Sequence, residues 1–224
     1  MTSVSEVGYE GDTMEGQEGE PRAKPNGREA QRKQTRQRVY AAAIAEFKRV
    51  GMAEADVGVI VKDAGVARGT FYFHYPTKEH VLAELERSEE ARVAAQFTRF
   101  TAEPHDVAEV LGEVVRLLTA VERRVGRVLF HEMLGLHFSP RRPDVLPGAD
   151  EWADYPLMML VIEAVERARE RGEVYPGASA LHTAQFFMLG LYAMLITSDG
   201  QPKTARAATL DNFVATVLRG IESR

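Results

Sequence analysis

Apolar residues recur along most of the chain at the three-and-four spacing that is typical of amphipathic helices. The first such run begins near Thr35 and stops at Gly51. Its apolar face consists of Val39, Ala42, Ala43, Phe47 and Val50. A glycine after the last periodic residue is a common helix end, so this segment is predicted to be one helix.

Two short helices are predicted next. Asp56 occupies the position of an N-cap, and the helix that follows, 57–64, is predicted to end at Gly65, because glycine adopts the positive φ that closes a helix. A third helix begins near Arg68 and ends before Pro76. Two short helices joined by a glycine-containing turn and packed on a longer helix are the layout of a helix-turn-helix, here at about residues 56–75.

The rest of the chain continues the helical pattern. Thr77 is predicted to cap a long fourth helix, and further helices are expected near 106–122, 124–138, 152–171, 179–198 and 204–222. No segment alternates with period two for long enough to predict a strand, and no internal repeat is visible. The fold class is therefore predicted to be all-α with about nine helices.

Three regions follow from these patterns. Residues 1–31 contain almost no large apolar side chains and are predicted to be a disordered tail, acidic first and basic afterwards. Residues 33–93 are predicted to form a helix-turn-helix domain, and residues 94–224 a helical domain for ligand binding and dimerisation.

Basic residues cluster between Arg22 and Arg38 although the chain has a net charge of −5. Phosphate affinity depends on such local charge, so this cluster, and Arg36 within it, is predicted to meet DNA.

Composition narrows the cellular setting. The chain has no cysteine, which excludes disulfides, thiolate metal sites and cysteine nucleophiles and favours a reducing cytoplasm. The longest unbroken apolar stretch, 186–196, is shorter than the ~20 residues that span a bilayer, and residues 1–20 contain no basic residue that could open a signal peptide. A cytoplasmic protein without a membrane partner is predicted.

The third helix has distinct faces. At 100° per residue, Phe71 and Tyr75 lie together on the side that packs against the first helix, whereas Phe73 points in the opposite direction. An outward phenylalanine is explained if it rests on thymine methyl groups in a major groove. Gly69 then permits close approach of the helix, and Arg68 is able to contact guanine or phosphate. Residues able to hydrogen-bond phosphate oxygens are Thr70, Tyr72 and His74, and Lys78 adds a charge. Taken singly, these residues are equally compatible with an aromatic cluster that stabilises a small helical domain.

Taken as one string, the segment resembles the DNA-binding signature of the tetracycline-repressor (TetR) family. The matching run is Ile60-Val61-Lys62-Asp63-Ala64-Gly65-Val66-Ala67-Arg68-Gly69-Thr70-Phe71-Tyr72-Phe73-His74-Tyr75-Pro76-Thr77-Lys78-Glu79. The resemblance is close over about residues 33–93; beyond them only helix number and length agree. It implies a homodimer that binds a palindromic operator and a divergent C-terminal domain whose ligand changes the spacing of the two DNA-binding heads.

The resemblance also implies roles for individual residues. The DNA-contacting positions of the family carry over to Arg68, Gly69, Thr70, Tyr72, Phe73, His74 and Lys78. Two residues depart from the pattern. Ala67 stands where the family usually has Ser or Thr, so a side-chain cap of ~1 kcal/mol is missing. Gly58 is expected to loosen the second helix by up to ~1 kcal/mol.

The C-terminal helices are predicted to form the dimer. The segment 181–196 is apolar nearly all round, which requires cover on two sides, and the last helix has an apolar stripe with alanines that allow close approach. A four-helix bundle across a twofold axis is predicted, the alternative being that both helices complete a monomer core. The predicted interface residues are Met188, Leu191, Tyr192, Leu195, Leu210, Phe213, Val214 and Val217.

The middle helices contain aromatic residues and methionines with a few polar groups, a mixture that suits a small hydrophobic or amphipathic effector. The predicted ligand-binding residues are Phe130, His131, Met133, Leu134, Phe138, Trp152, Tyr155, Met159, Glu163 and Phe187. Many of them are equally compatible with a plain core. His131 and His137 do not share a helix face well, so no metal and no cofactor is predicted.

The preferred function is a one-component transcriptional regulator, a repressor by family default, that is released from DNA by its effector. An enzyme using His131, Glu132 or His137 as acid-base groups is the rival of another class, but no nucleophile, phosphate loop or metal-ligand set supports it, and no catalytic residue is predicted. A DNA-binding regulator controlled by a protein partner is the second alternative.

Overall fold

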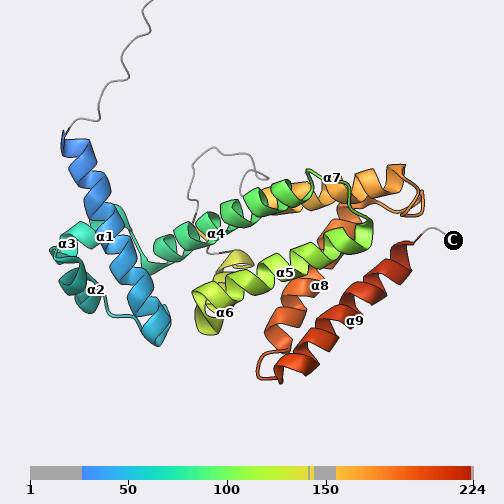
Figure 1. Cartoon of the computed structure of the whole chain (residues 1–224). Coiled ribbons are helices and arrows are strands. Elements are labelled where there is room, and N and C mark those ends of the chain that lie inside the picture. Colours follow the sequence, from blue (N-terminus) through green and yellow to red (C-terminus); the bar gives the residue numbers. More distant parts are fainter. Residues whose placement is uncertain (1–26, 141, 144–154, 223–224) are drawn as a thin grey trace, which may run out of the picture.

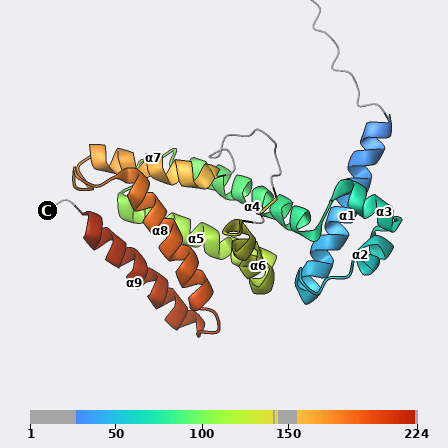
Figure 2. The same ribbon diagram turned by 180° about the vertical axis from the view of Figure 1, so that it is seen from behind.

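A computed structural model describes residues 27–140, 142–143 and 155–222 (Figure 1, Figure 2). Over these ranges the chain forms nine helices and no strand, apart from an isolated bridge between Val174 and Glu222. The helices are α1 Gly27–Val50, α2 Val57–Ala64, α3 Arg68–His74, α4 Lys78–Phe100, α5 Val107–Val125, α6 Arg127–His137, α7 Pro156–Glu170, α8 Ala180–Thr197 and α9 Lys203–Ile221. The all-α prediction is confirmed.

Helix α1 begins earlier than the apolar pattern indicates. The predicted tail included residues 27–31, and that part of the prediction is wrong, because these residues are helical. They are exposed, and Arg, Glu, Ala and Gln have high helix propensity, so a helix anchored further along extends through them at little cost. The apolar face marks where the helix is packed, not where it begins. The rest of the tail, 1–26, lies outside the described residues.

The first three helices form a small head whose caps agree with the sequence. The Asp56 carboxylate accepts a hydrogen bond from the Gly58 amide at 2.7 Å, and Gly65 ends α2 with φ 63°. Ala67 precedes α3 without a side-chain cap, as its methyl group requires. Fully buried Phe47 from α1, Ile60 from α2 and Phe71 from α3 pack together as the centre of the head.

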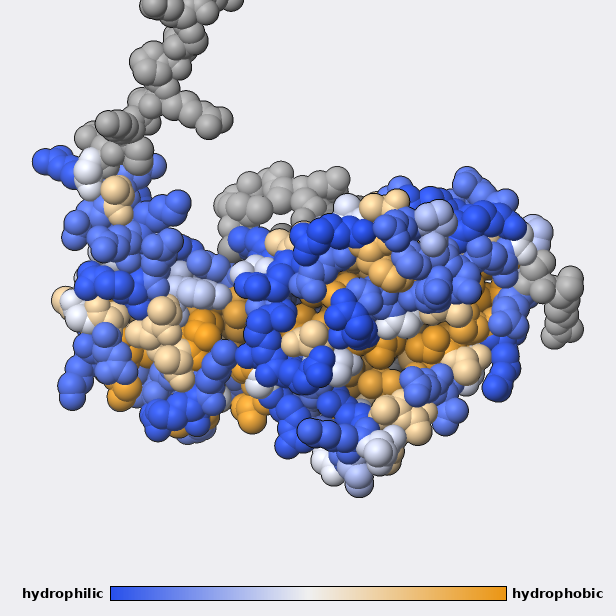
Figure 3. Space-filling model, viewed as in Figure 1, coloured by the Kyte–Doolittle hydropathy of each residue, from blue (hydrophilic) through white to orange (hydrophobic). Residues whose placement is uncertain are grey.

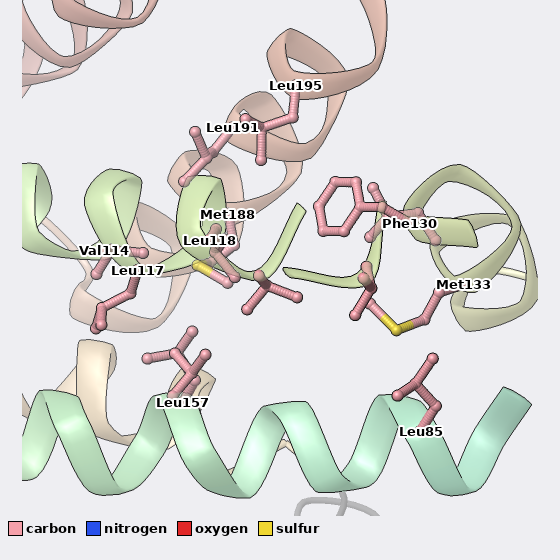
Figure 4. Packing of buried hydrophobic residues seen from close by; sticks show 14 of the residues in the cluster. Leu85, Val114, Leu117, Leu118, Phe130, Met133, Leu157, Met188, Leu191 and Leu195 are labelled. Carbon is pink, nitrogen blue, oxygen red and sulfur yellow. The ribbon is translucent and has the colours of Figure 1, made fainter. Parts of the chain in front are cut away.

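Helix α4 is shared by the two parts of the molecule. It starts beside the head and runs into the bundle of α5 to α9, where α7 lies along its second half (Figure 1, Figure 2). The bundle core is built from side chains that α4, α5, α6, α7 and α8 direct toward one another (Figure 4). Among them, Met188, Leu191 and Leu195 place one face of α8 against the bundle interior.

Helix α9 is attached to the bundle by a close approach and by a buried ion pair. A Cβ added to Gly190 of α8 would lie 2.6 Å from the Phe213 ring, which instead stacks on Phe187 with ring centroids 5.6 Å apart. Arg206 of α9 donates to the Glu122 carboxylate of α5 at 2.7 Å and to the Ser198 hydroxyl at 3.1 Å. Glu122 is only 1% exposed, so its charge depends on this partner.

Candidate nucleic-acid interface and ligand cavity

The exposure of α3 follows the angles calculated from the sequence. Phe71 and Tyr75 are buried, whereas Phe73 is 66% and Tyr72 45% exposed. Arg68 and Gly69 are also exposed, and Thr70 is half-buried on the shoulder between the two faces. An outer surface of α3 composed of Arg68, Gly69, Tyr72 and Phe73 therefore faces away from the protein; it is called the reading face below.

His74 does not belong to the reading face. The residue is only 9% exposed, and this burial, followed by the charges of Arg36 and Arg32, lowers the pKa of its imidazole. Its position on the helix, 240° from Arg68, directs it toward α1 rather than outward. The prediction that its ring contacts DNA is therefore wrong in this structure.

Arg36 is occupied inside the head. Its guanidinium donates to the His74 carbonyl at 2.8 Å, forms an ion pair with Glu84, and lies 4.3 Å from the centroid of the Tyr75 ring. These three partners hold its charge between α1, α3 and α4, but its side chain is 40% exposed, so a DNA contact of Arg36 stays a prediction. Arg32, one turn earlier, lies 5.1 Å from the Phe73 ring centroid and is exposed. The basic run contained this residue, but nothing in the spacing singled it out.

Lys78, at the start of α4, is hydrogen-bonded to the head. Its ammonium group donates to the carbonyl oxygens of Ala53 and Ala55, at 2.8 and 3.2 Å. These bonds hold the loop between α1 and α2 against the start of α4. The prediction that Lys78 contacts phosphate therefore conflicts with a structure in which its charge serves the fold.

The bundle encloses a small cavity of about 30 Å³ between α4, α5, α6 and α8. Its apolar wall includes Phe130, Met133 and Leu134, three of the predicted ligand-binding residues. Its other wall is acidic, because Glu86, Glu89 and Glu90 of α4 all line it. A space of this size holds one or two water molecules or one small polar group.

Two of the three carboxylates have cationic partners. Glu86 accepts from the Arg142 guanidinium at 3.3 Å, and its other oxygen lies 2.5 Å from His137 Nδ1. Glu89 pairs with the guanidinium of Arg124. The Glu90 carboxylate accepts a hydrogen bond from the Leu157 backbone amide at 3.0 Å and has no ion pair among the residues that the structure describes. Burial raises the pKa of Glu90 to about 7, against the smaller opposing effects of that amide and of His137.

Tyr192 of α8 closes the cavity on the side opposite α4. Burial raises the pKa of its phenol well above the ordinary value, and the nearby Glu90 and Glu86 charges raise it further. Its ring lies 5.9 Å from the rings of His137 and Phe138. Tyr192 was predicted at the dimer interface; its ring packs beside His137 and Phe138, but the residue is only half-buried, so its place in a dimer stays a prediction.

A wider groove of 380 Å³ begins on the other side of His137. It is lined by His137, Tyr155, Met158, Gln185, Phe186 and Leu189. His137 belongs to both the cavity and the groove, and its ring lies 5.2 Å from that of Tyr155. The inner cavity and the outer groove are thus two compartments separated by aromatic side chains.

The remaining predicted ligand residues are dispersed. Met159 and Glu163 line a separate depression on the outside of α7, so their assignment to the same pocket is wrong. Phe187 is fully buried against Phe213 and lines neither compartment. Phe138 stacks edge-on beside His137, and Trp152 lies outside the described residues. His131 is half-buried, with an Nε2 atom that has no hydrogen-bond partner in the part of the chain that the structure describes.

The acidic wall was missed, although the sequence contained a signal for it. In α4 the apolar stripe of Leu82, Leu85 and Val93 continues through Glu86 and Glu89 at the same three-and-four spacing. Charged residues at core-facing positions need partners, and such positions are typical of functional interiors. Within the described ranges no group of three potential ligating side chains is arranged for a metal ion.

The side of α8 that was predicted to form the dimer faces the interior of the protomer instead. Met188, Leu191 and Leu195 are buried within the protomer, as is Leu210 of α9, so none of these four can contact a partner. The opposite side of α8 is exposed instead, with Phe186 at 72% and Leu189 at 50%, followed by Ala193 and Ile196 at helical spacing. Hydrophobic surface is also visible across the bundle in Figure 3. Phe213, Val214 and Val217 are half-buried and keep some surface on α9.

By length and apolar composition α8 would suffice to cross a membrane, and only a third of it is buried within the protein. The same composition is typical of helices packed on two sides, so this feature is weak as an indication of a membrane span.

The bundle contacts the head at a short junction. The Glu132 carboxylate of α6 accepts hydrogen bonds from the backbone amide of Met52, at 2.8 Å, and of Ala53, at 3.4 Å. Gly51 adopts φ 84°, and a Cβ there would lie 3.0 Å from a Glu132 oxygen. This Gly51–Glu132 junction is defined here by Gly51, Met52, Ala53 and Glu132.

Comparison with known proteins agrees with this architecture. Residues 39–85 match the family model of the bacterial regulatory proteins of the tetR family. The chain is 29% identical over 106 residues to the HTH-type transcriptional regulator AcrR of Shigella flexneri, covering 44% of this chain and 49% of AcrR. It is 36% identical over 69 residues to the HTH-type transcriptional regulator TtgW of Pseudomonas putida, covering 31% and 52%. The matched segments thus span about half the length of these curated relatives.

A solved structure extends the likeness beyond the head. The crystal structure of FadR from Thermus thermophilus, a TetR-family transcriptional repressor in complex with lauroyl-CoA, is 25% identical and superposes with a TM-score of 0.63. The match covers 84% of this chain and 96% of FadR, so it includes the bundle as well as the helix-turn-helix. The helix-turn-helix of this chain is thus that of the tetR family of bacterial regulatory proteins, and its described residues share the fold of a TetR-family transcriptional repressor.

Proposed function

We propose that this protein is a cytoplasmic repressor, not an enzyme, that binds a palindromic operator as a homodimer and is released by a small amphipathic effector. The observation that supports it most directly is the reading face, where Phe73 and Tyr72 are exposed beside Arg68 although large aromatic side chains favour burial. Large apolar side chains that are exposed together on a protein surface commonly mark a site that a binding partner covers.

The chemistry of the reading face fits a major groove. Gly69 leaves room for the α3 backbone to approach base edges, Phe73 offers an apolar ring to thymine methyl groups, and Arg68 offers a bidentate donor to guanine or phosphate. The guanidinium of Arg32, 5.1 Å from the centroid of the Phe73 ring, adds positive charge beside the reading face. Thr70 and Tyr72 supply hydroxyl groups for phosphate oxygens.

The exposed side of α8 supports self-association. Phe186, Leu189 and Ile196 form an apolar stripe that water would otherwise contact, and the half-buried residues of α9 extend it. A twofold pairing of this surface places two reading faces on one duplex, and a twofold protein reads a palindrome. Three of the residues predicted at the dimer interface are partly exposed and remain part of this proposal: Phe213, Val214 and Val217.

The effector is proposed to occupy the compartments around His137. A groove of 380 Å³ with aromatic and methionine walls has the size and lining of a small-molecule site. The relative from Thermus thermophilus was solved with an amphipathic ligand, lauroyl-CoA. Displacement of α6 by a bound molecule would act on the Gly51–Glu132 junction and so on the head.

Selection of operators from a random duplex pool tests the proposal. Wild type, Thr70→Ala and Phe73→Ala are each incubated with the pool at moderate salt and the bound DNA is sequenced. We expect wild type to enrich a palindrome, Thr70→Ala to bind all sequences more weakly, and Phe73→Ala to lose base preference. If wild type enriches nothing, and mass spectrometry of the denatured sample finds no co-purified small molecule, the proposal fails.

A further inference from the structure

We infer that the effector is an amphipathic organic cation, whose ammonium group enters the inner cavity at Glu90 and whose apolar part lies in the outer groove. This inference rests on the proposed function, since it names the class of molecule that the bundle recognises. It follows from the charges around the cavity, the aromatic walls and the sizes of the two compartments.

Among the described residues around the cavity, one carboxylate, that of Glu90, has no ion-pair partner. His137 and Arg142 oppose Glu86, and Arg124 opposes Glu89. For Glu90, the groups that face it are Glu86 from its own helix, His137 from α6, Arg142 from the segment after α6, the Leu157 amide from α7 and Tyr192 from α8. None of the cationic groups among them forms an ion pair with Glu90 in the described part of the chain. A ligand that brings a positive charge would supply the missing partner.

An anionic ligand would be disfavoured in this cavity. Its charge would lie beside an uncompensated carboxylate in a buried site, where the electrostatic repulsion is stronger than in water. Arg142 could offset that repulsion only by leaving Glu86 and Tyr155, to which it is hydrogen-bonded at 3.3 and 2.8 Å. The cavity therefore favours a cation over a carboxylate or a phosphate, in contrast to the polyanionic lauroyl-CoA found with the relative from Thermus thermophilus.

The aromatic walls suit the same ligand. The rings of Tyr155 and Tyr192 lie 5.2 and 5.9 Å from the ring of His137, and tyrosine faces attract organic cations by about 0.5–2 kcal/mol each. Tyr192 lines the cavity, and its hydroxyl makes no hydrogen bond to any described residue. It is an acceptor that an ammonium N–H can reach.

The sizes of the compartments indicate which part of the ligand goes where. The inner cavity of about 30 Å³ accepts a primary ammonium group, which is about as large as a water molecule, but not a trimethylammonium group. The outer groove of 380 Å³, with Phe186, Leu189 and Met158 on its walls, accepts an alkyl chain or a ring system. A primary or secondary amine with one apolar tail matches both compartments.

Three probes of equal chain length test the inference: decylamine, decanoate and decyltrimethylammonium, each used below its micelle concentration. Binding to the full chain is measured by titration calorimetry at pH 7.5 without DNA, so the result does not depend on an operator. We expect decylamine to bind at least about tenfold more tightly than the other two, the difference made by one charge-assisted hydrogen bond in a buried site.

Variants locate the binding charge. Glu90→Gln keeps the shape of the side chain and is expected to weaken decylamine binding by about 10- to 100-fold. Glu163→Gln, on the outer side of α7, is the matched control and should not change it. Tyr192→Phe removes one acceptor and is expected to weaken binding by a few-fold. Thermal unfolding of each variant shows whether it is folded.

Distinct results would overturn the inference and the proposed function. Equal binding of decanoate and decylamine to wild type, or unchanged decylamine binding to folded Glu90→Gln and Tyr192→Phe, would overturn the inference alone. Selective decylamine binding that does not release the selected palindrome would support the binding site and contradict its regulatory role. Failure to select any palindrome would count against the proposed function and leave the calorimetric result standing.

Discussion

The head and the bundle use charged and aromatic residues in opposite ways. In the head, Phe73, Tyr72 and Arg68 stand on the surface of a seven-residue helix, and their direction follows from the helical angle alone. In the bundle, Glu86, Glu89 and Glu90 point inward, and their environment depends on four other helices. Side chains of the first kind are expected to affect binding without affecting stability, and side chains of the second kind to affect both. The predictions below test this division.

The largest effect is expected from Arg206→Ala in the bundle. The substitution leaves the buried Glu122 carboxylate without its partner at 2.7 Å, which we expect to lower the free energy of unfolding by about 3–5 kcal/mol. Urea unfolding measures it. The double variant Arg206→Met with Glu122→Met removes both charges and should recover most of the loss. A loss below 1 kcal/mol for Arg206→Ala would mean that the interior charge is not held by this pair.

The next effect is a dependence of stability on pH. Because burial raises the pKa of Glu90 from about 4.5 to about 7, the folded protein binds a proton that the unfolded chain releases between these values. Stability contributed by this proton is present below pH 4.5 and is lost as the pH rises through 7, by up to about 3 kcal/mol. The measured quantity is the difference in the free energy of unfolding between wild type and Glu90→Gln at pH 5 and pH 8.

Glu90→Gln is therefore expected to gain stability relative to wild type as the pH rises. Identical pH profiles of the two proteins would contradict the assignment of a perturbed interior carboxyl at this position. Glu163→Gln serves again as the control, because its exposed carboxyl should leave the profile unchanged.

A smaller effect is expected from Gly190→Val. The new side chain would collide with the Phe213 ring, which already lies 2.6 Å from where a Cβ would stand. We expect the free energy of unfolding to fall by about 1–3 kcal/mol as α8 and α9 are pushed apart. Gly112→Ala, where a Cβ meets no atom within 4 Å, is the matched control. Equal melting temperatures for wild type and Gly190→Val would show that the two helices do not pack as described.

Phe73→Ala tests the other half of the comparison. Its side chain is 66% exposed, so the unfolding free energy should change by less than about 0.5 kcal/mol, whereas operator affinity should fall by about tenfold. Fluorescence anisotropy with the selected duplex measures the affinity. Tyr175→Ala, an exposed aromatic at the far end of the bundle, should alter neither quantity beyond these limits. A Phe73→Ala variant that unfolds easily would indicate a structural aromatic cluster instead.

The smallest effect is expected at the Gly51–Glu132 junction. Glu132→Gln replaces a charged acceptor by a neutral one, which we expect to reduce stability by about 1 kcal/mol or less and to speed hydrogen exchange at the Met52 and Ala53 amides by up to about tenfold. The amide of Gly58, capped by Asp56, is the internal reference. Unchanged exchange at Met52 would show that this amide is protected by something else.

The sequence predicted most where local rules suffice. Asp56 and Gly65 gave the ends of α2, and the helical angle placed Phe71 and Phe73 on opposite sides of α3. It predicted less where tertiary partners decide. The position of Arg36 in a basic run predicts a phosphate ligand, but in the fold its guanidinium bonds to the His74 carbonyl and to Glu84. The all-round apolar character of α8 leaves its inward and outward sides indistinguishable from sequence. The spacing of apolar residues predicts that a helix has an apolar face, but it does not predict which neighbouring element covers that face.

The Gly51–Glu132 junction has a consequence for the construction of hybrid regulators. A side chain at Gly51 would be strained by the positive φ and would bring a Cβ to 3.0 Å from a Glu132 oxygen, so these two positions, far apart in the sequence, constrain each other. A head transplanted from another regulator onto this bundle would need a glycine at the end of its first helix, and a foreign bundle would need an acceptor at the place of Glu132. Exchange of these parts is thus expected to succeed only when both residues are transferred with their partner surface.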